Sequence, residues 1–314
     1  MSEGALFKKM TLIGAGLIGS SIAHAARRGH LVEHIAAYIP RAETREKAAK
    51  AGFAHSLHAE LQPALDGADL VVLATPIGIY AELAGKIAPH LKKGAILTDV
   101  GSVKAVVIRD VGPHVPEGVH FIPGHPVAGT EQSGPDAGFA ELFDGRWCIL
   151  TPPPGTDAAA IGKLENFWRR LGSDVEVMEP KHHDLVMAIV SHVPHLIAYN
   201  IVGTAADLET VTQSEVIKFS ASGFRDFTRI AASDPTMWRD IFLNNRDAVL
   251  EMLGRFNEDL AALQRAVRWG DGEALFNLFT RTRAIRRSII QAGQDTAAPN
   301  FGRSGNSGSS SGGS

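Results

Sequence analysis

The segment Met10-Thr11-Leu12-Ile13-Gly14-Ala15-Gly16-Leu17-Ile18-Gly19 joins a short apolar run to a glycine-rich turn, and a helix-like segment, residues 20–28, follows directly. Strand, turn and helix in this order are the context in which a GxGxxG pattern predicts dinucleotide binding. Gly14 would form the turn, Gly16 would let the backbone approach a pyrophosphate, and Gly19 would let the helix pack closely on the strand. We therefore expect a cofactor site here rather than an ordinary glycine turn.

The helix that follows the glycines would hold the phosphates. Leu17 and Ile18 lie at its start. Free backbone N–H groups and the positive end of the helix dipole favour an anion at such a position. Leu17 and Ile18 are therefore predicted to bind the cofactor together with the glycines.

Apolar runs and helix-like segments alternate through the first half of the chain. Further apolar runs cover residues 34–38, 70–74, 95–99 and 119–122, and amphipathic segments such as residues 42–51 separate them. Near-continuous apolar strands separated by helices imply a parallel sheet covered on both faces. The predicted fold class is α/β, with an N-terminal Rossmann-type doubly wound parallel sheet.

The carboxyl ends of these strands should border one crevice, because ligands of such sheets bind there. That edge would bring together Thr75, Pro76, Ser102 and His125. His125 follows an apolar run and lies in what reads as a glycine- and proline-rich loop. It could act as a general base near neutral pH if a neighbour fixes its tautomer, or it could be a surface histidine in a turn.

The end of the second strand bears on the choice between NAD and NADP. An acid there would bind the ribose of NAD, but the sequence reads Ala37-Tyr38-Ile39-Pro40-Arg41. Arg41, helped by Arg45, could instead pair with the 2′-phosphate of NADP. The sequence favours NADP, or the use of both cofactors, although Arg41 could equally solvate the start of a helix.

The second half is mostly helical. Apolar residues recur at helical spacing over residues 185–208, 237–267 and 273–292. An all-α domain of this kind buries its apolar stripes against a second copy, so a homodimer is expected. The predicted domains are residues 1–178 (dinucleotide-binding, Rossmann-type), 179–295 (helical, substrate-binding and dimerisation) and 296–314 (a disordered Gly/Ser tail).

Composition excludes several classes of protein. With 314 residues and a net charge of -3, the chain lacks the basic excess of a nucleic-acid or membrane-surface binder. No run is expected to reach the roughly 18 to 20 apolar residues of a membrane span. The single cysteine, Cys148, is predicted to lie in a buried strand, and a cytoplasmic location is expected.

Five motifs give the chain a resemblance to a known family. In order they are Gly14-Ala15-Gly16-Leu17-Ile18-Gly19, Asp99-Val100-Gly101-Ser102-Val103-Lys104, Gly124-His125-Pro126-Val127-Ala128-Gly129-Thr130-Glu131, Ser191-His192-Val193-Pro194-His195 and Gly223-Phe224-Arg225-Asp226-Phe227-Thr228-Arg229-Ile230-Ala231. Together they resemble the prephenate/arogenate (cyclohexadienyl) dehydrogenases of tyrosine biosynthesis. The length leaves no room for an appended chorismate mutase segment, so the single-activity form is expected.

The resemblance implies an oxidative decarboxylation. A hydride leaves C4 of the cyclohexadienol for the nicotinamide of NAD or NADP, and CO2 departs as the ring becomes aromatic. His125 matches the family's catalytic histidine, and Ser102 matches the serine that orients it. Arg229 matches the arginine that binds a substrate carboxylate, for which a guanidinium fork is suited.

Further residues are assigned to the substrate pocket by the same resemblance. Ser191 and His195 lie four residues apart and so share a helix face, which would line the pocket. Glu131 and Trp238 match positions that border the pocket in members accepting prephenate, so prephenate, or both substrates, is favoured. His192 would point elsewhere and have a structural role.

Alternatives remain at this stage. A hydroxyacid-type dehydrogenase would share the two-domain plan but use a lysine as base, and a dinucleotide-binding sensor would have no catalytic group. His182 and His183 suggest a metal at first sight, but adjacent helical residues diverge by about 100 degrees. We expect no metal site, and we interpret both histidines as a solvated helix start.

Overall fold

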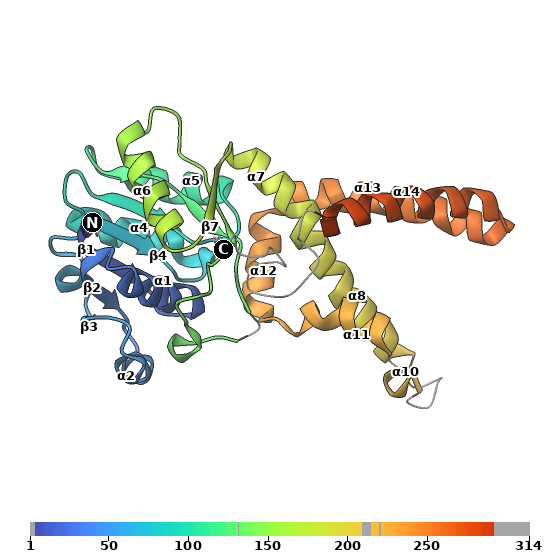
Figure 1. Cartoon of the computed structure of the whole chain (residues 1–314), viewed down its shortest axis with the longest axis horizontal. Coiled ribbons are helices and arrows are strands. Elements are labelled where there is room, and N and C mark those ends of the chain that lie inside the picture. The colour runs from blue at the N-terminus through green and yellow to red at the C-terminus, as the bar shows by residue number, and fades with distance from the viewer. Residues whose placement is uncertain (1–3, 131, 209–214, 220, 292–314) are drawn as a thin grey trace, which may run out of the picture.

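A computed structural model describes residues 4–130, 132–208, 215–219 and 221–291. A sheet domain forms the N-terminal part, and a helical region follows it (Figure 1). The predicted tail, residues 296–314, lies outside the described residues.

The main sheet has six parallel strands, in the order β3-β2-β1-β4-β5-β6. The strands are β1 (Phe7–Ile13), β2 (Val32–Tyr38), β3 (Ser56–His58), β4 (Leu70–Leu73), β5 (Ile96–Asp99) and β6 (His120–Phe121). The order reverses direction at β1 and β4, the point where such sheets bind ligands. This confirms the predicted doubly wound parallel sheet, to which β3 is an addition.

Helices cover both faces of this sheet. They are α1 (Leu17–Arg28), α2 (Ala42–Ala51), α3 (Leu61–Leu65), α4 (Tyr80–Ile87), α5 (Ala105–Val111) and α6 (Ala158–Arg170). Alternate residues of β4 face different hydrophobic clusters: Leu70 and Val72 pack in the cluster of α1 and α6, whereas Val71 and Leu73 pack in that of α4 and α5. Each strand is therefore apolar on both sides, which explains the unbroken apolar runs.

A second, three-stranded sheet holds His125. It consists of β7 (Gly124–Pro126), β8 (Trp147–Leu150) and β9 (Asp174–Val177), with β7 antiparallel and β9 parallel to β8. The prediction of a loop around His125 is wrong, because this residue pairs with Ile149 in the sheet. Three residues that include a glycine and a proline carry too little strand pattern for the sequence to indicate a strand.

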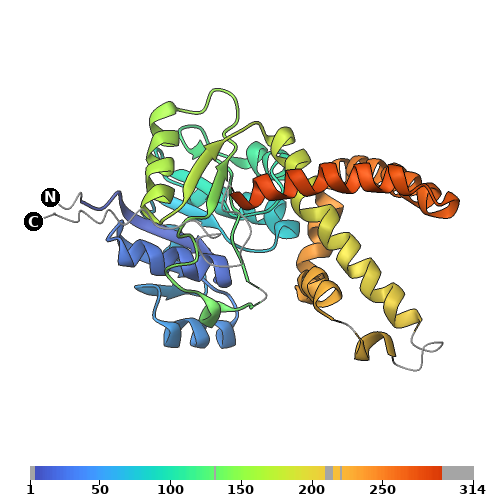
Figure 2. The same cartoon turned by 45° about the vertical axis from the view of Figure 1, so that its right-hand side comes forward.

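The helical region begins at Pro180 and ends, as described, at Gln291. Its elements are α7 (Pro180–Met187), the π-helical turn η5 (Ala188–His192), α8 (Val193–Asp207), α10 (Glu215–Lys218), α11 (Ser222–Thr228), η6 (Arg229–Ala232), α12 (Pro235–Asn244), α13 (Arg246–Trp269) and α14 (Gly272–Gln291). The segment predicted over residues 237–267 is two helices that part at Asn245. Both views show the α13–α14 hairpin extending away from the sheet (Figures 1 and 2).

Helix α12 joins the two parts. Its Trp238 and Ile241 are buried in the hydrophobic cluster that also contains Tyr80 and Leu83 of α4. The side chains of α12 thus complete a core that the sheet domain begins, which fixes this helix against the carboxyl edge of the sheet.

Residues Pro180–Asp207 form one long helical run that reaches the length and apolar composition of a membrane-crossing helix, and 28% of its apolar 18-residue window is buried. The expectation that no segment would reach this length is therefore wrong. A single such helix is weak evidence for a membrane, because core and interface helices meet the same criteria.

Candidate active site

The glycine turn between β1 and α1 has the geometry of a phosphate-binding loop. Gly14 has φ of 99°, and a Cβ there would lie 2.7 Å from the carbonyl oxygen of Ala74. A Cβ on Gly19 would lie 2.9 Å from the carbonyl oxygen of Gly14. A Cβ on Gly16 would meet nothing within 4 Å. The first and third glycines are thus required by the protein itself, whereas Gly16 borders open space at the start of α1.

A cavity of about 200 Å³ adjoins this turn. Gly14, Tyr38, Pro40 and Thr75 line it at the ends of β1, β2 and β4. The buried Oγ1 of Thr75 has no hydrogen-bond partner among the described residues. An open glycine, a free helix N-terminus and an unpaired hydroxyl fit the pyrophosphate and adenosine of a dinucleotide. Pro76 follows Thr75 and is exposed.

The two arginines expected near the adenosine differ. Arg45 Nη1 donates to the carbonyl oxygens of Ile39 (2.8 Å) and Pro40 (2.9 Å), so it holds the loop after β2. Arg41, which begins α2, is exposed, and no hydrogen bond of its side chain occurs within the described ranges. Arg41 is therefore the freer of the two to meet a phosphate.

His125 is only 7% exposed on β7. Its Nδ1 lies 2.8 Å from Nε2 of His183, while its Nε2 has no hydrogen bond to any residue that the structure describes. Burial, and then the nearby His183 and Lys104, hold the pKa of His125 well below its usual value. The imidazole is therefore neutral at neutral pH, as a proton acceptor must be.

A buried ion pair holds the strand that carries His125. Lys104 Nζ lies 2.6 Å from Asp99 Oδ2, and both side chains are fully buried. Lys104 also donates to the carbonyl oxygen of Gly124 (2.6 Å), and the backbone N–H of Gly124 donates to Asp99 Oδ1 (3.1 Å). The pair therefore clamps both backbone groups of the residue before His125. Burial raises the pKa of Asp99 and lowers that of Lys104, while their short contact acts in the opposite direction.

His183 is fully buried, so its assignment to a solvated helix start is wrong. It lies on α7, where Nδ1 is 2.8 Å from Asp184 Oδ1. Asp184 also accepts the backbone N–H groups of Lys104 (2.7 Å) and Ala105 (2.9 Å). His182 is exposed, because consecutive helical residues face different ways. One face of α7 thus packs on β7 and on the start of α5.

His192 is 1% exposed, and its Nδ1 accepts a hydrogen bond from Asn245 Nδ2 (3.0 Å). The same amide donates to the carbonyl oxygen of Asp184 (2.8 Å). Burial, opposed in part by the charge of Asp184 and aided by nearby His183 and His195, lowers the pKa of His192 to about 4. His192 therefore lies between the residues around His125 and those around His195.

Four of the predicted substrate residues are related through His195: Ser191, Trp238 and Arg229 each act on its ring. His195 Nδ1 lies 2.8 Å from the backbone carbonyl oxygen of Ser191, which belongs to the π-helical turn η5. The His195 ring stacks on the indole of Trp238. Burial, and then the charge of Arg229, lower the pKa of His195, so the guanidinium is close to that ring.

Ser102 is the residue predicted to orient His125. Ser102 is half-buried in the loop after β5, and its hydroxyl makes no hydrogen bond to His125 in the described part of the chain. The residue on the Nδ1 side of His125 is His183 instead. Glu131 lies outside the described residues.

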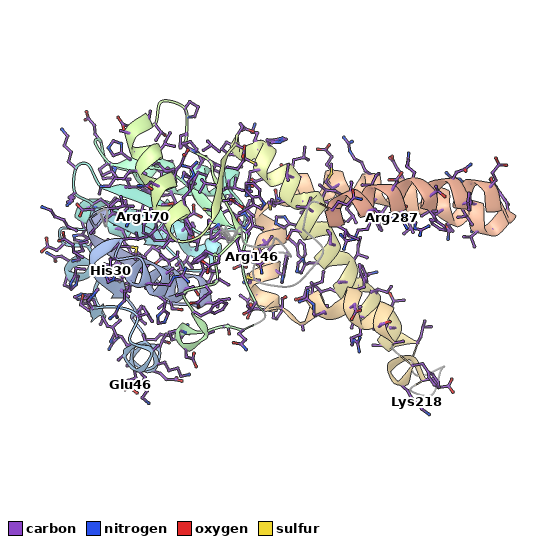
Figure 3. All side chains as sticks on the ribbon, in the orientation of Figure 1. His30, Glu46, Arg146, Arg170, Lys218 and Arg287 are labelled. Atoms are coloured by element: carbon purple, nitrogen blue, oxygen red, sulfur yellow. The ribbon has the colours of Figure 1, made fainter. Side chains whose placement is uncertain are left out.

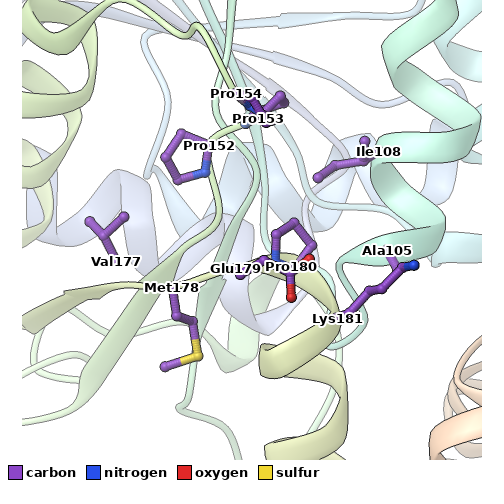
Figure 4. A pocket seen from close by; sticks show the side chains of 10 residues that line it. All are labelled: Ala105, Ile108, Pro152, Pro153, Pro154, Val177, Met178, Glu179, Pro180 and Lys181. Carbon is purple, nitrogen blue, oxygen red and sulfur yellow. The ribbon is translucent and has the colours of Figure 1, made fainter.

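A larger cavity, of about 590 Å³, lies elsewhere (Figure 4). Prolines 152 to 154, Val177, Met178 and Ile108 make most of its wall apolar. It contains none of the residues predicted to bind cofactor or substrate. Among the described residues, no group of three or more His, Cys, Asp or Glu side chains is placed to hold a metal ion.

The supporting residues of the site were not identified from the sequence. Asp99 and Lys104 stand in a motif that was noted, but nothing local showed that they are buried together. His183 and Asp184 lie 58 and 59 positions after His125, and no periodicity links segments so far apart. A charged lysine five residues after a strand and a His-Asp pair one turn into a helix are too common to indicate a site.

Comparison with known proteins agrees with this architecture. Residues 22–177 match the family model described as prephenate dehydrogenase, nucleotide-binding domain, and residues 179–281 match prephenate dehydrogenase, dimerization domain. The chain is 38% identical over 284 residues to a cyclohexadienyl dehydrogenase of Zymomonas mobilis, covering 90% of this chain and 97% of the relative. It is 33% identical to a prephenate dehydrogenase of Bacillus subtilis, covering 92% and 78%.

Solved structures give the same result. A prephenate dehydrogenase from Aquifex aeolicus, in complex with hydroxyphenyl propionate and NAD+, has a TM-score of 0.84 and 33% identity, covering 90% of this chain and 98% of that one. An arogenate dehydrogenase from Synechocystis has a TM-score of 0.76 and 28% identity, covering 90% and 99%.

The parallel sheet, its glycine turn and the buried histidine beside it define a dehydrogenase that uses a nicotinamide dinucleotide. Within that class, the match over both domains is specific. The chain belongs to the prephenate dehydrogenase family.

Proposed function

We propose that this chain catalyses the oxidative decarboxylation of prephenate, arogenate or both, as a step of tyrosine biosynthesis. Prephenate would give 4-hydroxyphenylpyruvate, and arogenate would give tyrosine. The observation that carries the proposal is His125, which is buried and neutral and is held through Nδ1, so that Nε2 remains as an acceptor. Prephenate is favoured, because Glu131 and Trp238 match family positions found in members that accept it.

His125 would accept the proton of the substrate hydroxyl and later return it. A nicotinamide dinucleotide held at the glycine turn of Gly14 and Gly16 would supply the acceptor for the hydride of C4. As positive charge develops on that carbon, Nε2 of His125 takes the hydroxyl proton. Loss of CO2 leaves its electron pair in the ring, and the proton returns to the same oxygen as the phenol forms. Ser102 remains a proposed orienting residue of the His125 ring.

The substrate anion would be held on the helical side of the site. Arg229, which is exposed at the start of η6, would supply a positive charge near His195. His195 is oriented by Ser191 and by the indole of Trp238. These residues would hold the carboxylates of the substrate while His125 faces its hydroxyl.

The cofactor would be NADP or NAD, with NADP favoured. No acid ends β2, and the exposed side chain of Arg41 makes no hydrogen bond to any residue that the structure describes, whereas Arg45 is bound to backbone carbonyls. Gly14, Gly16, Gly19, Leu17 and Ile18 would meet the pyrophosphate, and Thr75 and Pro76 would border the cofactor at the end of β4.

The functional unit would be a homodimer assembled through the helical region. The matched family model is a dimerization domain. α14 has no buried residue in the single chain, and its side chains project on all sides of the hairpin (Figure 3). Several of them are large and apolar, including Phe276, Phe279 and Ile285. A second copy would cover them, as it would the apolar faces of α8.

Two domains would meet at residues 178 and 179, between the end of β9 and the start of α7. A cytoplasmic location is part of the proposal, because the only cysteine, Cys148, is buried and free.

Steady-state kinetics over two substrates and two cofactors test the proposal. Reduced cofactor should appear with prephenate, arogenate or both, and turnover should fall about 100- to 10,000-fold in His125→Asn with cofactor affinity kept. Activity on simple hydroxyacids alone would reject the proposed substrate. Cofactor binding without any turnover would leave a sensor, and a strong preference for NAD would reject the NADP assignment.

A further inference from the structure

The carboxylate of Asp184 fixes the direction of a hydrogen-bond chain that ends at His125. Two of its donors are the backbone N–H groups of Lys104 and Ala105, which can only donate. An ionised carboxylate can only accept, so the third partner, Nδ1 of His183, must carry a proton. Asp184 therefore sets the tautomer of His183.

The tautomer of His183 then sets that of His125. A neutral imidazole with its proton on Nδ1 has an acceptor at Nε2. Burial lowers the pKa of His183, which keeps the ring neutral. Nε2 of His183 lies 2.8 Å from Nδ1 of His125, so Nδ1 of His125 must be the donor. The remaining nitrogen of His125, Nε2, is left with its lone pair.

We propose that His183 and Asp184 are positioning residues that fix His125 in the tautomer with its proton on Nδ1, so that Nε2 is the base. The inference rests on the proposed function, in which His125 accepts the hydroxyl proton. The inference goes beyond that function by naming the nitrogen of His125 that accepts the proton and the two residues that select this nitrogen.

Packing alone would not require this arrangement. The chain connects three elements, β7, α7 and the start of α5, through directional contacts of 2.7 to 2.9 Å. The His125 and His183 rings meet edge to face, with planes inclined by 72°. An apolar ring of the same size in place of His183 would fill the space but offer no acceptor to His125.

The loss of that acceptor has a chemical consequence. A buried N–H group without a partner is costly, so His125 would move its proton to Nε2, where the substrate side of the site can accept it. The base would then be blocked while the fold and the cofactor site remain. In a serine protease triad, the wrong tautomer of the histidine lowers turnover about 10,000-fold.

Two variants separate the positioning role from packing. His183→Phe keeps the ring shape and removes the acceptor, whereas His183→Gln keeps an amide oxygen for His125 and an amide N–H for Asp184. We expect His183→Phe to lower kcat at least about 100-fold with the KM for cofactor unchanged, and His183→Gln to restore most of that loss. His182→Phe, at the exposed neighbouring position, is the matched control and should keep full activity.

Nitrogen-15 NMR of histidine-labelled enzyme reads the tautomer directly, with the His125 signal assigned by its loss in His125→Asn. Wild type should carry the proton on Nδ1, and His183→Phe should carry it on Nε2. A wild-type proton on Nε2 would overturn the proposal, as would His183→Phe with kcat within about threefold of wild type. An equal loss of kcat in folded His183→Gln and folded His183→Phe would also overturn the proposal.

The NMR result does not depend on turnover. If the wild type reduced no cofactor with either substrate, the proposed function would fail while the tautomer would still be decided. If His183→Phe did not fold, the wild-type tautomer and the kcat of His183→Gln would still decide the inference.

Discussion

His195 and Trp238 stack nearly face to face, with ring centroids 3.7 Å apart and planes inclined by 24°. His195 belongs to α8, and Trp238 belongs to α12. The indole is also buried against Tyr80 and Leu83 of α4. His195, a candidate substrate residue on one helix, is thereby fixed to the core of the sheet domain. The helical side of the site therefore keeps one position relative to the sheet side.

Replacing Trp238 by alanine should destabilise the protein and displace His195. We expect the free energy of unfolding to fall by about 3–5 kcal/mol, as for other buried aromatic side chains, and the KM for prephenate to rise. Trp238→Phe should cost less than about 1.5 kcal/mol, because the ring stack persists and the indole N–H has no partner among the described residues. Urea unfolding measures both. A cost below about 1 kcal/mol for the alanine variant would contradict the core role of the indole.

Substitutions at Gly16 and Gly14 should have different effects, the first on cofactor binding and the second on stability. A valine at Gly16 meets no protein atom within 4 Å of its Cβ but projects into the space proposed for the pyrophosphate. We expect at least about a tenfold rise in the KM for cofactor with little change in Tm. Gly14→Ala should instead lower stability by about 1–3 kcal/mol, because φ is 99° and the Cβ would lie 2.7 Å from a carbonyl oxygen. A Gly16→Val enzyme with unchanged cofactor KM would refute the assignment of that space.

The acid side of the pH profile should lie below the usual range for histidine. The sequence suggested an ordinary pKa for His125, near 6 to 7, but burial lowers it well below 6.5. The neutral ring is the active form, so a lowered pKa keeps activity as pH falls through 6.5 and loses it only at more acid pH. The measurement is kcat/KM against pH, which reports the free enzyme. A single ionisation close to 6.5 would show that His125 is better solvated than the structure indicates.

Much of the fold could be predicted because its strands are buried on both faces. Residues 70–74 are apolar without interruption, residues 95–99 begin with three apolar residues, and each segment lies within one residue of the observed strand. The three-residue strands β3 and β7 have no such pattern, since pairing with neighbouring strands forms them and local preference does not. Asn245 divides a segment whose apolar periodicity continues on both sides, so periodicity alone did not reveal the break.

The candidate site could be predicted only in part. Short motifs located His125, Ser191, His195 and Arg229, because their spacing resembles that of a known family. His183 was misassigned because its neighbours in sequence suggested solvent, whereas packing of α7 on β7 decides its burial. Contacts between segments far apart in sequence are set by the tertiary fold, and local patterns do not encode them.

The buried pair of Lys104 and Asp99 should matter far more than an exposed pair. Lys104→Met leaves the Asp99 carboxylate buried without its counter-charge and frees the carbonyl of Gly124. The free energy of unfolding should fall by about 3–5 kcal/mol. Lys92→Met is the control: it breaks a pair with Asp69 in which the lysine is 42% exposed, and should cost less than about 1 kcal/mol. If denaturant titrations gave the two variants an equal loss in free energy of unfolding, burial would not determine how much the ion pair contributes to stability.

Arg229 should act on substrate binding more than on turnover. Its charge is close enough to His195 to lower the pKa of that ring, and a guanidinium can hold a carboxylate through two parallel hydrogen bonds. A hydrogen bond to a charged group contributes about 1.5–3 kcal/mol, so Arg229→Ala should raise the KM for prephenate about 10- to 100-fold. Arg229→Lys should recover part of this, because charge remains while the fork is lost. Arg109→Ala is the control, since that exposed side chain on α5 pairs with its neighbour Asp110 at 2.6 Å. If KM were the same in wild type and Arg229→Ala at saturating cofactor, the arginine would lie outside the substrate pocket, and another cation would have to hold the carboxylate.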